Sequence, residues 1–142
     1  MKRNETNKAR AIKQGKKPLV PDLLWREGCV QVGEWAVRNN IELRGHALIW
    51  PGFGHMPSHY EKAHKDGTLD MNQALKDIQK WFAEAGELTA ATTVEWDVLN
   101  EPRSNHDIQD VVGDDIMIKW FHMAKQYFPN HRLFVNEYDI VV

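Results

Sequence analysis

Asn100 and Glu101 are the residues whose type and position most favour chemistry. The pair follows a mostly apolar run, residues 94–99, and precedes Pro102. Such a run is typical of a buried strand, and barrel enzymes place their catalytic groups at the carboxyl ends of buried strands. Glu101 is therefore a candidate catalytic carboxyl, although an isolated Asn-Glu-Pro segment is equally compatible with a surface carboxylate at the end of a strand.

A second candidate group lies upstream, in residues 44–50. Side chains of a strand alternate between its two faces, which predicts one shared side for Arg44, His46, Leu48 and Trp50. If this side faces the interior of a barrel, His46 and Trp50 point toward its upper mouth. Taken alone, these residues are also explained as a core tryptophan and a structural histidine.

Three strand-like runs position these groups, over residues 41–50, 92–99 and 132–140. They alternate with helical patterns and are nearly continuous in apolar residues, which indicates a parallel sheet covered by helices. The turns contain neither a Gly-rich dinucleotide fingerprint nor a P-loop. A closed barrel needs about 250 residues. The 142-residue chain is therefore predicted to be α/β, a partial (β/α)8 TIM barrel with two open sheet edges.

Three helices are predicted to alternate with the strands, the first of them preceding the first strand. Asp70 and Gln73 form a capping signal for the second helix. The third begins at Asp114-Asp115 and ends before Pro129. The residues between 51 and 59 are predicted to form a loop. The stripes expected to be buried are Trp25, Cys29, Val32 and Ala36; Met71, Leu75, Ile78, Phe82 and Ala85; and Ile116, Trp120, Met123 and Tyr127.

Three segments carry a resemblance to a known family: Arg44–Trp50 with its Arg-Gly-His-x-x-x-Trp pattern, Val94–Pro102 with Asn-Glu, and Leu133–Tyr138 with Asn-Glu-Tyr. In this order they resemble the family 10 glycoside hydrolases, whose typical member is an endo-β-1,4-xylanase. The resemblance implies a central fragment covering about strands 3 to 5 of the barrel. It also implies hydrolysis of β-1,4 bonds in xylan with retention, and no cofactor is expected.

The resemblance assigns roles residue by residue. Glu101 matches the family's general acid/base, and Asn100 matches the residue that hydrogen-bonds the sugar 2-hydroxyl. His46 and Trp50 match residues that line the subsite of the sugar to be cleaved. These types suit the task, because an indole offers a flat apolar face to a sugar ring and an imidazole hydrogen-bonds hydroxyls.

Residues 136–138 fall in the family's Asn-Asp-Tyr segment. The resemblance makes Asn136, Glu137 and Tyr138 supporting residues, with a purely structural carboxylate as the alternative for Glu137. A retaining enzyme also needs a second carboxylate about 5–5.5 Å from the first, as nucleophile. In the family this group lies much further along the chain, so we expect it downstream of Val142.

One departure from the family pattern affects the subsite. Many members have a second histidine directly after the tryptophan, whereas this chain has Pro51. Phe53 or His55 could supply replacement contacts.

The sequence is also compatible with other functions. The chain could be an inactive gene fragment or a non-catalytic carbohydrate-binding remnant. It could also act as a β-glucanase or mannanase of the same clan, or be an unrelated α/β binding domain.

Composition limits the partners. With 18 Lys plus Arg against 20 Asp plus Glu, neither nucleic acid nor a membrane is expected as partner. The single cysteine, Cys29, excludes an internal disulfide, and no metal site is expected, because Pro57 interrupts the spacing of His55, His59 and His64. The oligomeric state is left open.

The chain divides into a basic N-terminal arm, residues 1–22, and a partial catalytic barrel, residues 23–142. We expect the arm to be solvated or poorly ordered. No secretory signal is predicted, because the basic start is not followed by an apolar stretch. The family resemblance nevertheless implies a secreted full-length protein.

Overall fold

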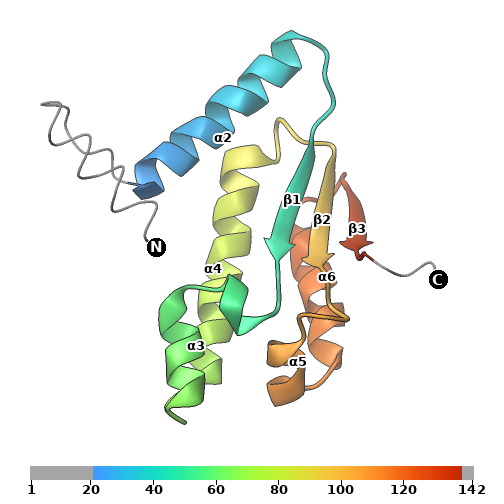
Figure 1. Ribbon diagram of the computed structural model, residues 1–142. Coiled ribbons are helices and arrows are strands. Elements are labelled where there is room, and N and C mark those ends of the chain that lie inside the picture. Colours follow the sequence, from blue (N-terminus) through green and yellow to red (C-terminus); the bar gives the residue numbers. More distant parts are fainter. Residues whose placement is uncertain (1–20, 139–142) are drawn as a thin grey trace, which may run out of the picture.

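The computed structural model describes residues 21–138, in which three parallel strands lie side by side against helices (Figure 1). The strands are β1 (Arg44–Ile49), β2 (Glu95–Asn100) and β3 (Arg132–Asn136), in the order β1-β2-β3. Both neighbouring pairs are parallel. The predicted strands are confirmed in number and order, although each is shorter than predicted.

Helices alternate with the strands, and they include the three that the sequence predicts. They are α2 (Pro21–Arg38), α3 (Ser58–Lys65), α4 (Met71–Thr89), α5 (Asp107–Val112) and α6 (Asp115–Tyr127), with a 3-10 turn η1 (Phe53–His55). The arm predicted for residues 1–22 lies outside the described residues, apart from Pro21 and Asp22, which begin α2. No helix among residues 21–138 is long and apolar enough to cross a membrane.

Three helix boundaries follow from the residues that predicted them. The Asp70 side chain accepts a hydrogen bond of 3.1 Å from the Gln73 backbone N–H, which satisfies one of the free donors at the start of α4. Helix α6 begins at Asp115 and ends at Tyr127, just before Pro129. The sequence signals at these positions are therefore confirmed.

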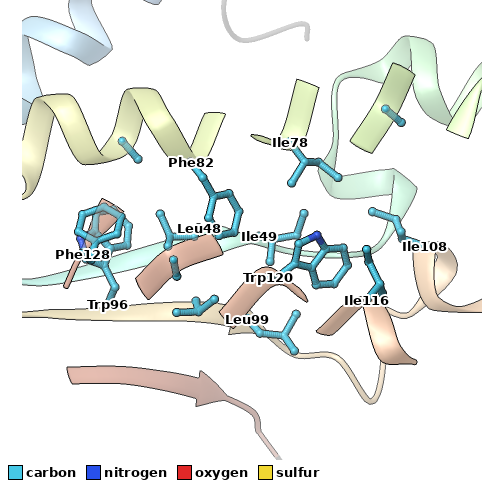
Figure 2. Packing of buried hydrophobic residues seen from close by; sticks show 14 of the residues in the cluster. Leu48, Ile49, Ile78, Phe82, Trp96, Leu99, Ile108, Ile116, Trp120 and Phe128 are labelled. Atoms are coloured by element: carbon cyan, nitrogen blue, oxygen red, sulfur yellow. The ribbon is translucent and has the colours of Figure 1, made fainter. Parts of the chain in front are cut away.

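The apolar core lies between the sheet and helices α4 and α6 (Figure 2). Phe82 and Ile78 reach it from α4, and Trp120 and Ile116 from α6. From β2, residues 96–100 are all buried, as expected for a strand with a neighbour on each side. Of the stripe residues predicted on these two helices, five are buried (Ile78, Phe82, Ala85, Ile116 and Trp120), whereas Met71, Leu75, Met123 and Tyr127 are half-buried.

The stripe predicted on α2 is wrong at Val32, whose exposed fraction is 57%. Helix α2 lies at the edge of the described chain and packs against α4 (Figure 1). Ala36 is buried there, whereas Cys29 is only half-buried. The side chain of Trp25 lies outside the described residues.

The short helices α3 and α5 were missed by the sequence patterns. Helix α3 buries a single residue, Tyr60, so it has no apolar stripe to detect. It gains support from the ion pairs Lys62–Asp66 and Lys65–Glu61, each four residues apart. His59, which was predicted to lie in a loop, and His64 are consequently both on a helix.

Candidate active site

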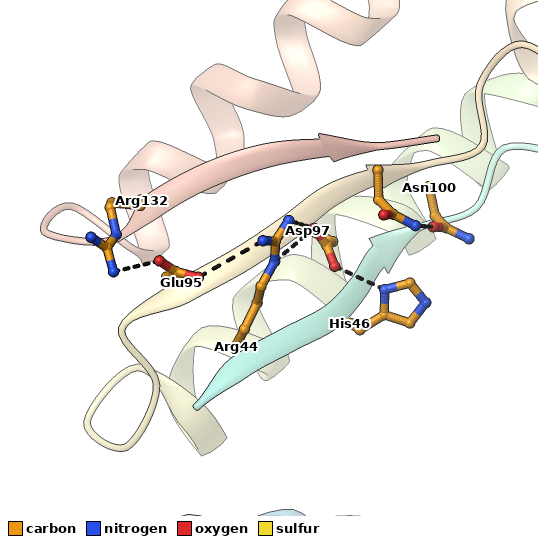
Figure 3. A network of polar contacts seen from close by, with 7 residues as sticks. Arg44, His46, Glu95, Asp97, Asn100 and Arg132 are labelled. Carbon is orange, nitrogen blue, oxygen red and sulfur yellow. Dashed lines mark hydrogen bonds and ion pairs between the residues drawn. The ribbon is translucent and has the colours of Figure 1, made fainter. Parts of the chain in front are cut away.

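A polar network occupies one face of the sheet (Figure 3). Asp97 of β2 is buried, and its Oδ1 accepts hydrogen bonds from Nε (2.9 Å) and Nη2 of Arg44. Glu95, which lies two residues before Asp97 in β2 and on the same face, pairs with Arg132 of β3. The Arg44 guanidinium also lies 3.9 Å from the centre of the Phe134 ring. These contacts tie the three strands together on the side facing away from the core.

His46, the third residue of β1, joins this network. Its Nδ1 lies 2.9 Å from Asp97 Oδ2. A carboxylate can only accept, so Nδ1 carries the proton and Nε2 points elsewhere. The His46 side chain is 53% exposed, which leaves Nε2 available to a ligand hydroxyl. Asp97 thus holds both Arg44 and His46 in place.

The predicted alternation of β1 ends after His46. The register of β1 against β2 shifts between His46 and Ile49. Leu48 and Ile49 are both buried in the core, whereas Arg44 and His46 are exposed. The prediction that Leu48 shares a side with Arg44 and His46 is therefore wrong, because strict alternation requires a regular register.

Trp50 follows β1 and lines a hollow of about 660 Å³. The hollow lies between the end of β1 and helices α3 and α4, and His46, His55 and Tyr60 line it too. Burial and a hydrogen bond to the Asp77 carboxylate raise the pKa of Tyr60 to about 12. The Tyr60 hydroxyl therefore stays a neutral hydrogen-bond donor at physiological pH.

Glu101 is the first residue after β2, and its backbone is left-handed, with φ of +50°. This conformation is unfavourable for a side chain with a Cβ, by roughly 1–2 kcal/mol. It is fixed from two directions. The Glu101 N–H donates to Asn136 O (2.7 Å), and the Glu101 carbonyl accepts from the Asn105 N–H (2.9 Å). Strained residues held in this way cluster at functional sites.

Asn100 is 1% exposed and is held by Asn136, whose Nδ2 donates to Asn100 Oδ1 over 2.7 Å. Figure 3 shows Asn100 toward the same end of the sheet as His46. The Asn100 Nδ2 has no hydrogen-bond partner among the described residues. A buried amide without a partner is rare and calls for an explanation. A ligand oxygen would supply the missing acceptor.

Glu137 braces the loop that follows Glu101. Its Oε2 accepts from the Arg103 backbone N–H (2.8 Å) and its Oε1 from the Tyr138 N–H (3.0 Å). Both oxygens therefore have backbone partners. Tyr138 itself is 58% exposed.

His55 and Asn105 link Trp50 to Glu101. The His55 ring is stacked on the Trp50 ring, with centroids 3.8 Å apart and planes at 6°. Its Nε2 lies 3.0 Å from Asn105 Oδ1, and Asn105 Nδ2 donates to Glu101 Oε2 over 3.3 Å. Phe53, the other suggested replacement contact, is buried and unavailable to a ligand. Among the described residues, no group of His, Cys, Asp or Glu is arranged to hold a metal ion.

Comparison with known proteins decides the family. The model of Glycosyl hydrolase family 10 matches residues 1–141. The chain belongs to glycosyl hydrolase family 10.

Several xylanases are similar to this chain in sequence. Endo-1,4-beta-xylanase A of Caldicellulosiruptor saccharolyticus is 24% identical over 126 residues, which are 80% of this chain and 35% of that protein. Endo-1,4-beta-xylanase 5-like of Arabidopsis thaliana is 31% identical over 109 residues, 76% of this chain and 18% of that protein. The family 10 chain therefore spans about a third or less of the length of these relatives.

A solved structure supports the fold. The crystal structure of an endo-1,4-beta-xylanase from Caldicellulosiruptor owensensis matches with a TM-score of 0.63 and 22% identity, covering 76% of this chain and 35% of that one. Such structural neighbours are (β/α)8 barrels, so the described strands and helices form part of one. The predicted fold class and family are confirmed.

The sequence missed Asn105 as a site residue and did not commit to Arg44 or Asp97. Arg44 and Asp97 carry a detectable signal, since each is a charged residue within a strand-like run. Asn105 and its link to His55 carry none, because the two residues meet only when the loops after β1 and β2 come together.

Proposed function

We propose that this chain supplies the proton-donor part of a retaining hydrolase of β-1,4 bonds in xylan. Glu101 is the general acid/base, Asn100 hydrogen-bonds the sugar 2-hydroxyl, and His46 and Trp50 line the sugar subsite. The names of the similar proteins support xylan rather than a glucan or mannan. Since xylan is a polymer outside the cell, the complete enzyme is proposed to be exported.

The observation that carries this proposal is the pair of groups at the end of β2. The strained Glu101 backbone directs a half-buried carboxyl to the sheet end, beside an Asn100 amide whose donor has no partner in the described chain. A sugar hydroxyl would satisfy that donor while the glycosidic oxygen approaches Glu101. His46 Nε2 is a further contact for hydroxyls on the same side.

In the first step, Glu101 gives its proton to the glycosidic oxygen as the bond from that oxygen to the anomeric carbon breaks. A second carboxylate forms a bond to the same carbon. In the second step, Glu101 takes a proton from a water molecule, which attacks the anomeric carbon and releases the carboxylate. Glu101 thus serves both steps.

Glu137 does not fit the role of the second carboxylate. Both of its oxygens accept backbone hydrogen bonds that hold the loop after Glu101. We propose that Glu137, Asn136 and Tyr138 support the site, and that the nucleophile is encoded downstream of Val142. The 142-residue chain alone is then expected to release no product from xylan or an aryl xylobioside.

The test begins with the coding sequence beyond Val142, which should encode a later strand ending in Thr-Glu-Leu-Asp or a similar segment. In the extended enzyme, Glu101→Gln should slow hydrolysis of xylan by about 10²–10⁴-fold. Hydrolysis of 2,4-dinitrophenyl β-xylobioside should be slowed far less in its first step, because that leaving group departs without a proton.

Two results would contradict the proposal. One is an equal loss in the first step for both substrates, which would show that Glu101 is not the proton donor. The other is turnover by the 142-residue chain alone that Glu101→Gln abolishes, because the chain would then contain its own nucleophile. A chain that binds xylo-oligosaccharides but has no active extended form would favour a carbohydrate-binding remnant.

A further inference from the structure

Two loops of the candidate site are fastened to each other. The loop after β1 and the loop after β2 share a hydrogen bond from the Phe53 N–H to Asp107 Oδ2 (2.7 Å) and another from the Ile108 N–H to Pro51 O (3.1 Å). A Cβ added at Gly52 would lie 3.1 Å from Asn105 Oδ1, so the loops are also in close contact there. The position of Asn105 is therefore set by both loops.

The orientation of the Asn105 amide follows from its neighbours. The Glu101 carboxylate is an acceptor, so the amide nitrogen must face Oε2, which is 3.3 Å away. The amide oxygen then faces His55 Nε2 at 3.0 Å, and that nitrogen donates. A flipped amide would bring two oxygens together at Glu101.

His55 is held in place by its stack on Trp50. The parallel rings, 3.8 Å apart, cover one face of the indole and keep Nε2 directed at Asn105. The opposite face of the indole is the one left for a sugar ring. Trp50, the residue proposed to contact the sugar ring, is thus connected to the Glu101 carboxyl through the side chains of His55 and Asn105.

We propose that Asn105 is a positioning residue for Glu101. By holding Oε2, it leaves Oε1 as the oxygen that carries the transferred proton, and His55 fixes the amide that does so. No hydrogen bond to Oε1 occurs within residues 21–138. The inference rests on the proposed function, since it assigns the proton of the proposed acid to one oxygen.

The test is a pH titration of the 15N-labelled 142-residue chain, followed through the side-chain amide protons of Asn105. Their resonance is assigned by its loss in Asn105→Leu. In the wild-type chain, these protons should move when Glu101 gains its proton. The movement should disappear in Glu101→Gln and persist in Glu137→Gln, because Glu137 bonds backbone N–H groups and not Asn105.

A second set of variants perturbs the contact between Asn105 and Glu101 without replacing either residue. His55→Phe keeps an aromatic ring on Trp50 but loses the donor, so the Asn105 response should be weakened, while His59→Phe on α3 should leave it unchanged. Gly52→Ala should weaken the response by displacing Asn105. Gly54→Ala is the matched control, because an added Cβ there meets nothing within 4 Å.

An Asn105 resonance that keeps its pH response in Glu101→Gln, or that responds equally in Gly52→Ala and Gly54→Ala, overturns the proposal. Neither readout depends on turnover. A preserved response in a chain whose extended form does not hydrolyse xylan would refute the proposed function and leave the positioning role intact. If the Asn105 resonance does not respond to pH while the extended enzyme hydrolyses xylan normally, the positioning role is refuted and the proposed function stands.

Discussion

The two faces of the sheet use opposite chemistry. The face toward α4 and α6 is apolar and closed, with Phe82, Trp120 and Phe128 nearly inaccessible to solvent (Figure 2). The other face carries ion pairs among Arg44, Asp97 and their neighbours, and several of these side chains are partly exposed (Figure 3). His46 lies on this polar face, and Asn100, at the end of β2, lies toward the same end of the sheet.

The difference separates stability from function within one sheet. Apolar burial contributes about 25 cal/mol per Å² and needs no particular direction. The polar face makes directional contacts. The hydrogen bond between His46 and Asp97 fixes which ring nitrogen carries the proton, and the ion pairs between neighbouring strands favour one register. We therefore expect substitutions on the apolar face to cost mainly folding free energy, and those on the polar face to change ligand contacts at a smaller cost in stability.

The largest expected effect is on the apolar face. Trp120→Ala removes a fully buried ring between α6 and the sheet and should lower the free energy of unfolding by about 3–5 kcal/mol. Urea unfolding followed by circular dichroism measures this loss. Trp35→Ala is the matched control, because Trp35 is 54% exposed. Equal losses for the two variants would contradict the assignment of the core.

A smaller loss is expected on the polar face. Asp97→Ala removes the acceptor of Arg44 and His46, and should cost about 1–3 kcal/mol. The cost stays below that of a fully buried pair because the two partner side chains are 40% and 53% exposed and can bind water. Asp110→Ala, an exposed carboxylate, serves as control. If Asp97→Ala lowered the free energy of unfolding by more than Trp120→Ala does, the polar face would contribute more to stability than the apolar face, contrary to our expectation.

The smallest effect is a pH dependence at the amino end of the sheet. Burial, together with the charge of Lys125, lowers the pKa of His131 below its ordinary 6.5. Above pH 6.5 the ring is neutral in both folded and unfolded chains. Below it the unfolded chain takes up the proton first, so stability falls as the pH is lowered. The drop between pH 7.5 and 5 should be smaller in His131→Gln and unchanged in His122→Gln.

Local signals predicted the fold well, but only where local energetics decide the structure. Asp70 and Pro129 bound helices because capping and proline geometry act within a few residues. The short helix α3 and the exposure of Val32 depend on neighbouring elements, which no periodicity reports. The irregular register after His46 likewise could not be read from alternation.

The site residues divide in the same way. Asn100 and Glu101 could be proposed from their place at the end of a strand-like run, and their roles remain predictions. The link from Trp50 through His55 and Asn105 to Glu101 joins residues about fifty positions apart. Only the packing of two loops creates it, so the sequence suggested His55 as a replacement contact without showing its partner.

The most direct test of the central claim is a titration of the 15N-labelled chain with xylotriose, monitored by backbone and indole resonances. We predict millimolar binding with shifts at residues 46–55 and 100–105, and at the part of α4 that lines the Trp50 hollow, with none along α6. Trp50→Ala should abolish these shifts and Trp35→Ala should not. Shifts confined to the helical side, or none at saturating sugar, would contradict the account.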